Sequence, residues 1–154
     1  MKKQYLSWRE IEQLCVALAT KVREGGFAPD YLVGVALGGL VPLTLISREL
    51  GVTDVSVIRA RSYDTNSHER KELVIDEFPD VDLSGKQVLL VDEIADSGET
   101  LKRVSELLRE RSHAEVIKTA TLVVHASHCS AAPDFSVMKT EEWVVFPWEA
   151  DARR

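Results

Sequence analysis

Three carboxylates follow a strongly apolar run near the middle of the chain. The run 87–91 leads into Asp92 and Glu93, and two residues separate Glu93 from Asp96. A short, continuous apolar run of this kind is typical of a strand that is buried on both faces of a parallel sheet. Ligands bind outside the carboxyl ends of such strands. The sequence therefore predicts a cluster of acids at a ligand-binding edge of a sheet.

The residues after the acids favour the binding of a phosphate. Ser97, Gly98, Glu99 and Thr100 join the predicted strand to a helix, and at such a junction backbone N–H groups and hydroxyls converge on an anion. The segment has neither the lysine nor the spacing of a P-loop, which indicates a phosphate monoester rather than a nucleoside triphosphate. Acids beside the phosphate can accept hydrogen bonds from sugar hydroxyls, so a ribose phosphate fits. Acids that are merely solvated at a strand end are the alternative.

Strands and helices alternate along the chain around this segment. A capping box at Ser7 and Glu10 predicts the start of a helix that stops at 25–26, and a second helix is expected over 40–50. The expected strands are 31–36, 55–60, 72–78, 87–91 and 116–124, with short β-like pieces from 135 onward. The polar stretch 61–71 has no apolar periodicity and is predicted to be a mobile loop. This alternation predicts an α/β fold with a central parallel sheet flanked by helices, in one domain over 1–154.

Composition excludes several classes of protein. The net charge of −6 argues against a chain that coats nucleic acid. No apolar run approaches the roughly 20 residues that span a bilayer, so we expect no membrane association. Cys15 and Cys129 have no metal-binding or redox spacing and are expected to be reduced thiols. A soluble, cytoplasmic protein is the resulting expectation.

The acidic segment resembles the phosphoribosyl diphosphate signature of the type I phosphoribosyltransferases. That signature is a hydrophobic strand, two acids, two variable residues, then Asp, Ser or Thr, Gly, a variable residue and Thr, and 88–101 matches it. Segment 35–42 resembles the pyrophosphate loop of the family and 62–64 its flexible loop. Trp143 with 147–149 resembles the end of the bacterial xanthine-guanine members. The resemblance implies the fold of that family, a small hood formed by the chain ends, and a homodimer or homotetramer.

The resemblance also implies a role for each matched residue. Asp92 and Glu93 would hold the ribose hydroxyls, and they would bind Mg²⁺ indirectly through those hydroxyls or water. Asp96 would lie near N7 of a purine and act as a proton relay. These three are the expected catalytic residues. The 5-phosphate contacts are Asp96, Ser97, Gly98, Glu99 and Thr100, and the pyrophosphate contacts are Leu37, Gly38 and Gly39. The base contacts are Trp143 and His125, and Ser62 and Tyr63 belong to the flexible loop.

Two departures from the family pattern leave alternatives open. Ala36-Leu37 stands where a Ser-Arg type pair is usual, so a cationic contact to the diphosphate is missing and the contact is expected from Mg²⁺ or from Arg61, Arg70 and Lys71. His125 stands near the place of a lysine that donates to the 6-oxo group, and it is either the replacement donor or a surface histidine. Trp143 is either a stacking platform or a core residue.

Three functions remain in view at this point. The leading one is a Mg²⁺-dependent purine salvage enzyme that converts a 6-oxopurine and phosphoribosyl diphosphate into a nucleoside 5-monophosphate and pyrophosphate. The second is a non-catalytic sensor of phosphoribosyl diphosphate or nucleotides, and the third is a phosphoribosyltransferase for another acceptor. The sequence leaves open which base is accepted.

Overall fold

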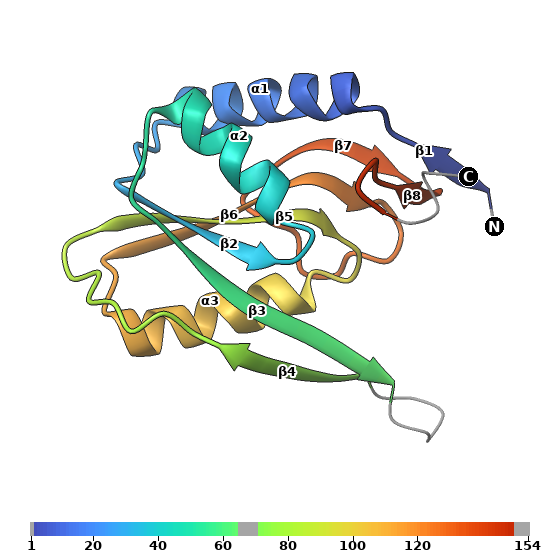
Figure 1. Ribbon diagram of the computed structural model, residues 1–154. Coiled ribbons are helices and arrows are strands. Elements are labelled where there is room, and N and C mark those ends of the chain that lie inside the picture. The colour runs from blue at the N-terminus through green and yellow to red at the C-terminus, as the bar shows by residue number, and fades with distance from the viewer. Residues whose placement is uncertain (1, 65–70, 150–154) are drawn as a thin grey trace.

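The computed structural model describes residues 2–64 and 71–149, with the side chains of 62–64 and 71 excepted. A six-stranded sheet in the order β4-β3-β2-β5-β6-β7 forms its centre (Figure 1). Its parallel strands are β2 (Tyr31–Ala36), β3 (Val55–Asp64), β5 (Gln87–Ala95), β6 (Val116–His125) and β7 (Phe135–Thr140). The strand β4 (Lys71–Glu77) pairs antiparallel with β3. The expected α/β fold with a largely parallel sheet is confirmed.

Helices cover both faces of the sheet. The helices α1 (Trp8–Glu24) and α2 (Leu40–Leu50) lie on one face and α3 (Glu99–Ser112) on the other (Figure 1). The predicted capping box at Ser7 is present, with the Ser7 hydroxyl accepting from the Glu10 amide and the Glu10 carboxylate accepting from the Ser7 amide. The apolar core is accordingly split in two, one part under α1 and α2 and the other under α3. The central strand β5 is buried on both sides over 88–92, which explains its unbroken apolar run.

The two ends of the chain meet in a small hood. The strands β1 (Lys3–Tyr5) and β8 (Trp143–Val145) form a separate parallel pair in which Lys3 lies opposite Trp143. The amide of Trp143 donates to the carbonyl of Lys2 at 3.0 Å, and the amide of Leu6 donates to Val145 at 3.0 Å. The hood expected from the family resemblance is confirmed. It fixes Trp143 over the carboxyl edge of the large sheet.

The polar stretch after Ala60 departs from the sequence-based expectation. β3 continues to Asp64 and β4 begins at Lys71, so both ends of the predicted loop 61–71 are strand (Figure 1). Antiparallel backbone pairing holds this ribbon, whose Ile58 and Ile75 also pack in the core under α3. Ion pairs join Asp76 to Arg59 at 2.9 Å and to Arg61 at 3.2 Å. Residues 65–70 lie outside the described residues, and Ser62 and Tyr63 are placed only as backbone of β3.

Two smaller expectations can be compared with the structure. Cys15 and Cys129 are both free thiols, and burial raises the pKa of Cys15 to about 12. Within 2–64 and 71–149, none of the helices has the length and apolar character to cross a bilayer.

Candidate active site

Asp92 and Glu93 lie inside β5 rather than after it. The strand extends to Ala95, and Asp92 is only 9% exposed. Burial raises the pKa of the Asp92 carboxyl well above its usual range, and the charge of Glu93 and a side-chain hydrogen bond with Glu93 raise this pKa further. The Glu93 amide donates to Asp92 Oδ1 at 2.8 Å and acts in the opposite direction, lowering the pKa. The two acidic side chains therefore interact directly, and the charge of Glu93 disfavours ionisation of Asp92. Holding acidic groups this close in a buried position is costly, which is typical of functional sites.

The Glu93 carboxylate packs against the loop between β2 and α2. A Cβ atom added to Gly38 would overlap the Glu93 carboxylate, and one added to Gly39 would lie 2.5 Å from the carbonyl oxygen of Val35. Both positions thus require glycine because other groups approach closely. Oxygen Oε2 of Glu93 is buried and has no hydrogen-bond partner among the described residues. A buried acceptor without a partner is a place where a ligand hydroxyl can bind.

Backbone contacts fix the conformation of the loop between β5 and α3. Gly98 is the N-cap of α3 with a φ of 84°, and a Cβ at this position would overlap the carbonyl oxygen of Ala131. The amides of Ser130 and Ala131 donate to the carbonyl of Ser97 at 3.1 and 3.2 Å. Segment 130–131 therefore braces the loop from outside, while the loop itself presents the start of a helix to the cavity. This is the arrangement in which helix N-termini bind phosphate.

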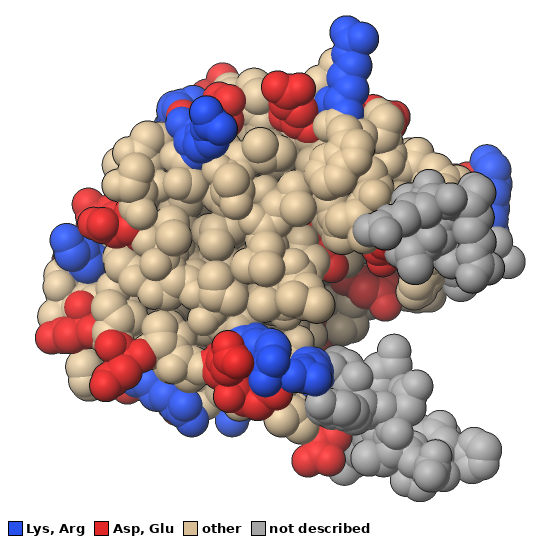
Figure 2. All heavy atoms as spheres, viewed as in Figure 1, with Lys and Arg blue, Asp and Glu red and all other residues tan. Residues whose placement is uncertain are grey.

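A cavity of about 330 Å³, which we call the acidic chamber, joins these parts. It is lined by the β2 end with Leu37 and Gly38, by Ala60 of β3, and by 92–98 with Thr100 and Leu101. The three carboxylates predicted to act together do line one cavity. Carboxylates also show in the hollow between the hood and the β3–β4 ribbon (Figure 2). Among the described lining residues there is no lysine or arginine.

The departure at Ala36-Leu37 has a clear structural outcome. Leu37 is 78% exposed and lines the acidic chamber beside Gly38, so the loop offers main-chain groups there and no cation. From β3 the chamber receives Ala60, whereas Arg61 pairs with Asp76 at 3.2 Å. Neighbouring residues of a strand point to opposite faces. In this arrangement Arg61 does not line the chamber, and its contact with a diphosphate stays a prediction. Arg70 and the side chain of Lys71 lie outside the described residues.

A second cavity of about 200 Å³, the hood chamber, adjoins the first. Its lining includes Trp143 and Phe146 from the hood and His125 from the end of β6. Glu93, Ile94 and Asp96 line both chambers, so the two form one continuous site with an acidic and an aromatic half. Trp143 is 53% exposed, which rules out the alternative that it fills the core.

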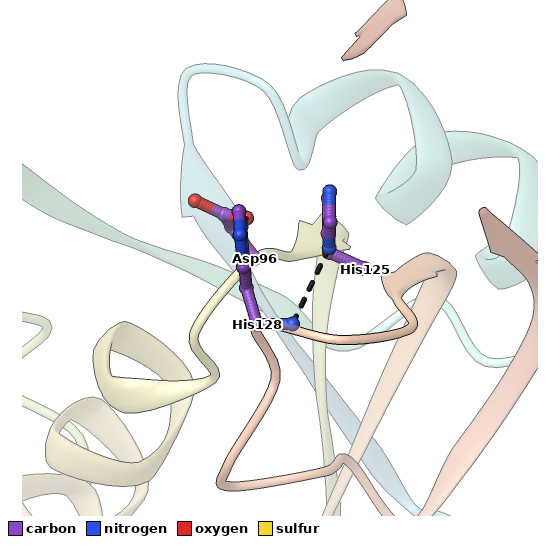
Figure 3. A group of neighbouring side chains, drawn as sticks. All are labelled: Asp96, His125 and His128. Atoms are coloured by element: carbon purple, nitrogen blue, oxygen red, sulfur yellow. Dashed lines mark hydrogen bonds and ion pairs between the residues drawn. The ribbon is translucent and has the colours of Figure 1, made fainter. Parts of the chain in front are cut away.

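His125 is buried at the wall of the hood chamber. The backbone amide of His128 donates to its Nδ1 at 3.4 Å, and the two imidazole rings stack 4.0 Å apart (Figure 3). A neutral histidine that accepts at Nδ1 carries its proton on Nε2. The contact at Nδ1 leaves Nε2 as the ring nitrogen that can serve a ligand. The alternative of a surface position is wrong, because His125 is buried.

Several contributors to the site were not predicted from sequence. Ile94 occupies a variable position of the 88–101 signature and lines both chambers, and Phe146 forms part of the hood chamber. The ring of Trp148 stacks on that of Phe146, with 4.8 Å between the centroids, and the exposed Trp8 lies tilted against Trp148. Ala131 contributes only its backbone, so no side-chain pattern could have indicated it.

Comparisons with known proteins agree with this geometry. Residues 1–153 match the phosphoribosyl transferase domain family. A xanthine-guanine phosphoribosyltransferase of Cereibacter sphaeroides is 31% identical over 153 residues, with 94% of this chain and 86% of that protein covered. Among solved structures, a purine phosphoribosyltransferase from Pyrococcus horikoshii Ot3 has a TM-score of 0.84 at 38% identity, covering 97% and 95% of the two chains. A xanthine-guanine-hypoxanthine phosphoribosyltransferase from Helicobacter pylori has a TM-score of 0.86 at 27% identity, covering 98% and 96%. The chain belongs to the phosphoribosyltransferase family.

Proposed function

We propose that the protein is a purine salvage phosphoribosyltransferase. It transfers the 5-phosphoribosyl group from phosphoribosyl diphosphate to a nitrogen of a 6-oxopurine. The C1–oxygen bond to the diphosphate breaks, a C1–nitrogen bond forms, and a nucleoside 5-monophosphate and pyrophosphate leave. The observation that carries the proposal is the pair of adjoining chambers, one acidic and one aromatic, that share Glu93, Ile94 and Asp96.

In the acidic chamber, Asp92 and Glu93 are proposed to hold the ribose diol. The unpartnered Oε2 of Glu93 supplies a buried acceptor for one hydroxyl. Displacement at C1 builds positive charge on the ring, and nearby carboxylates stabilise an oxocarbenium-like transition state, as they do in glycosidases. The 5-phosphate is assigned to the loop of Asp96, Ser97, Gly98, Glu99 and Thr100, where it meets backbone N–H groups and the dipole of α3.

The donor set of the acidic chamber fits Mg²⁺. Three carboxylates and no described cation line it, and Mg²⁺ prefers oxygen ligands, keeps several waters and binds readily to substrate phosphates. Asp92 and Glu93 are the residues that would hold it, through ribose hydroxyls or water. When bound, the ion supplies the positive charge that the diphosphate needs where this chain has Ala36-Leu37. Backbone groups of Leu37, Gly38 and Gly39 are proposed to complete the pyrophosphate site.

In the hood chamber, three residues are proposed to select and orient the base. Trp143 stacks on the purine, and the Nε2–H group of His125 donates to the 6-oxo oxygen. Asp96, which reaches both chambers, accepts or relays the proton that the base loses near N7. The geometry favours a 6-oxopurine over adenine because a 6-amino group would meet another donor at His125.

The role of His125 predicts a change in base selectivity. In His125→Phe, the 6-oxo group loses its donor, so we expect kcat/KM for guanine or hypoxanthine to fall by about tenfold or more, the cost of one unpaired buried acceptor. Adenine use should not fall in parallel. His125→Gln keeps an N–H donor and should recover part of the loss. Equal kcat/KM values for the 6-oxopurines in wild type and His125→Phe, at unchanged circular dichroism, would contradict the assignment.

Trp143 offers a second test in the same chamber. Stacking on an aromatic side chain is worth about 1–3 kcal/mol per base, so Trp143→Ala should raise the KM for the base by about 5-fold to 150-fold. The KM for phosphoribosyl diphosphate should change little, and the midpoint of thermal unfolding should hardly move because the side chain is half exposed. Trp143→Phe keeps a ring and serves as the matched control. A loss shared equally by both substrates would argue against stacking.

Turnover separates the enzyme from the sensor of the same fold. The protein is incubated with Mg²⁺, phosphoribosyl diphosphate and each purine in turn, and pyrophosphate release is followed. We expect release with at least one 6-oxopurine and none after chelation of Mg²⁺. Binding of phosphoribosyl diphosphate without turnover on any purine would favour the sensor. Turnover restricted to another acceptor would make Trp143 a wall of the pocket rather than a base platform.

Assembly into two or four copies, in the cytoplasm, is part of the same proposal. Support for the assembly comes from a surface area without charged residues over α2 and the strands beside it (Figure 2). Leu37, Leu40 and Val57, from this part of the chain, are among the exposed large apolar side chains.

A further inference from the structure

Three metal-ligating side chains meet beside the hood chamber. Asp96 comes from the loop after β5, His125 ends β6, and His128 lies in the turn that follows (Figure 3). One ligand atom from each of the three lies within 4.8 Å of the others, and His128 Nδ1 is 3.6 Å from Asp96 Oδ1. Two imidazoles and one carboxylate with open positions are a donor set that suits zinc and similar ions.

We propose that Asp96, His125 and His128 bind a divalent transition-metal ion, zinc before others, and that this ion and the purine base exclude each other. The site differs from the proposed Mg²⁺ site in chemistry, because magnesium selects oxygen ligands and avoids an imidazole pair. Only the exclusion of the base rests on the proposed function. Binding of the ion is independent of it.

Small side-chain movements suffice to close the site. Ligand atoms around a tetrahedral zinc ion with bonds of about 2.1 Å lie about 3.4 Å apart. Asp96 and His128 have side chains that are 61% and 60% exposed and are free to turn, whereas His125 is buried. His125 therefore acts as the fixed ligand. The other two move onto the ion, and His128 gives up its stacked position against His125.

The tautomer of His125 decides between the ion and the base. An ion on Nε2 needs the lone pair of that atom, so the proton moves to Nδ1 and the hydrogen bond that the His128 amide donates to Nδ1 is lost. There the proton faces Oε2 of Glu141, which lies 3.9 Å away and is oriented by the Ser127 hydroxyl at 2.6 Å. A carboxylate behind a metal-bound imidazole is the usual outer partner of such ligands. In the base-binding tautomer, Nε2 instead keeps its proton and donates to the purine, so one histidine cannot serve both.

Direct zinc binding tests the site. Tag-free protein, stripped with a chelator, is titrated with zinc chloride in a calorimeter beside His128→Asn and His113→Asn. We expect one ion per chain, an affinity at least tenfold lower in His128→Asn, and no change in His113→Asn. His113 is a matched control because it is an imidazole at the C-cap of α3 with a φ of 58°, a conformation that asparagine tolerates. Equal affinity in His128→Asn and wild type would overturn the site.

A second titration tests the exclusion. Zinc is added with saturating 6-oxopurine nucleoside 5-monophosphate, and separately with ribose 5-phosphate, which leaves the hood chamber free. We expect the nucleotide to lower the apparent zinc affinity in proportion to its concentration and ribose 5-phosphate to have little effect. Unchanged zinc affinity with bound nucleotide would overturn the exclusion. A chain that binds zinc through His128 but shows no purine turnover with Mg²⁺ would refute the proposed function and leave the metal site standing.

Discussion

Replacing Asp92 by asparagine should remove at least 99% of kcat/KM while making the protein more stable. The loss follows because removing one preorganised electrostatic group from an active site typically costs about 100-fold to 1,000-fold in rate. The gain in stability follows from burial: the fold raises the pKa of Asp92, so it destabilises the charged form. Asparagine keeps an acceptor for the Glu93 amide, which now bonds to Asp92 Oδ1 at 2.8 Å, without the charge.

The stability gain should depend on pH in a defined direction. The folded pKa of Asp92 lies above its unfolded value, so the wild type gains stability as the pH falls through the folded pKa. The difference in unfolding midpoint between Asp92→Asn and wild type should therefore be present at pH 7 to 8 and shrink toward the ordinary aspartate pKa of about 3.9. Thermal unfolding followed by circular dichroism measures it. Asp80→Asn, at an exposed position, is the control. A variant that loses stability at pH 8, or keeps full turnover, would contradict the assignment of Asp92.

Gly98→Ala should raise the KM for phosphoribosyl diphosphate by about 100-fold or more, as the loss of two or three charge-assisted hydrogen bonds would. A methyl group at this position would overlap the carbonyl oxygen of Ala131, and the φ of 84° is unfavourable for alanine. The loop must then shift away from segment 130–131, and its amides no longer converge on the phosphate. In the variant, the shift also weakens the hydrogen bonds from the amides of 130–131 to the carbonyl of Ser97, so the free energy of unfolding should fall as well.

Gly26→Ala separates the clash from the backbone strain. Gly26 has a φ of 73° at the end of α1, and an added Cβ there would meet nothing within 4 Å. This control should lose about 1–2 kcal/mol of stability from the left-handed conformation alone, with KM unchanged. Steady-state kinetics and urea unfolding on both variants provide the comparison. A KM for phosphoribosyl diphosphate that stays at the wild-type value in Gly98→Ala would show that the 5-phosphate binds elsewhere.

The acidic half of the site could be predicted from sequence because its signals are local. An apolar run, two acids, a hydroxyl and a glycine at a strand-to-helix junction specify both the element and the chemistry within 88–101. Parallel pairing of β5 with β6 then brings His125 to the same edge, since Ala95 lies opposite Val124. The sequence indicated that strand ends meet, although the family resemblance was needed to single out His125.

The remaining features depend on contacts between distant segments. Beyond Ala60, the strand β3 continues in polar residues to Asp64, so this extension gave no apolar periodic signal. The bracing of Gly98 by Ala131 involves a carbonyl group that every residue possesses. The contact at His125 Nδ1 comes from one backbone amide in a turn. None of these is encoded in the type or spacing of the residues concerned.

A crystal structure with a bound 6-oxopurine nucleoside 5-monophosphate tests the central claim most directly. The account predicts the phosphate at the backbone amides of 97–100, the ribose hydroxyls within hydrogen-bond distance of Asp92 or Glu93, and the base against Trp143 with its 6-oxo group facing His125. A nucleotide bound outside the two chambers, or one whose ribose points away from both acids, would contradict it.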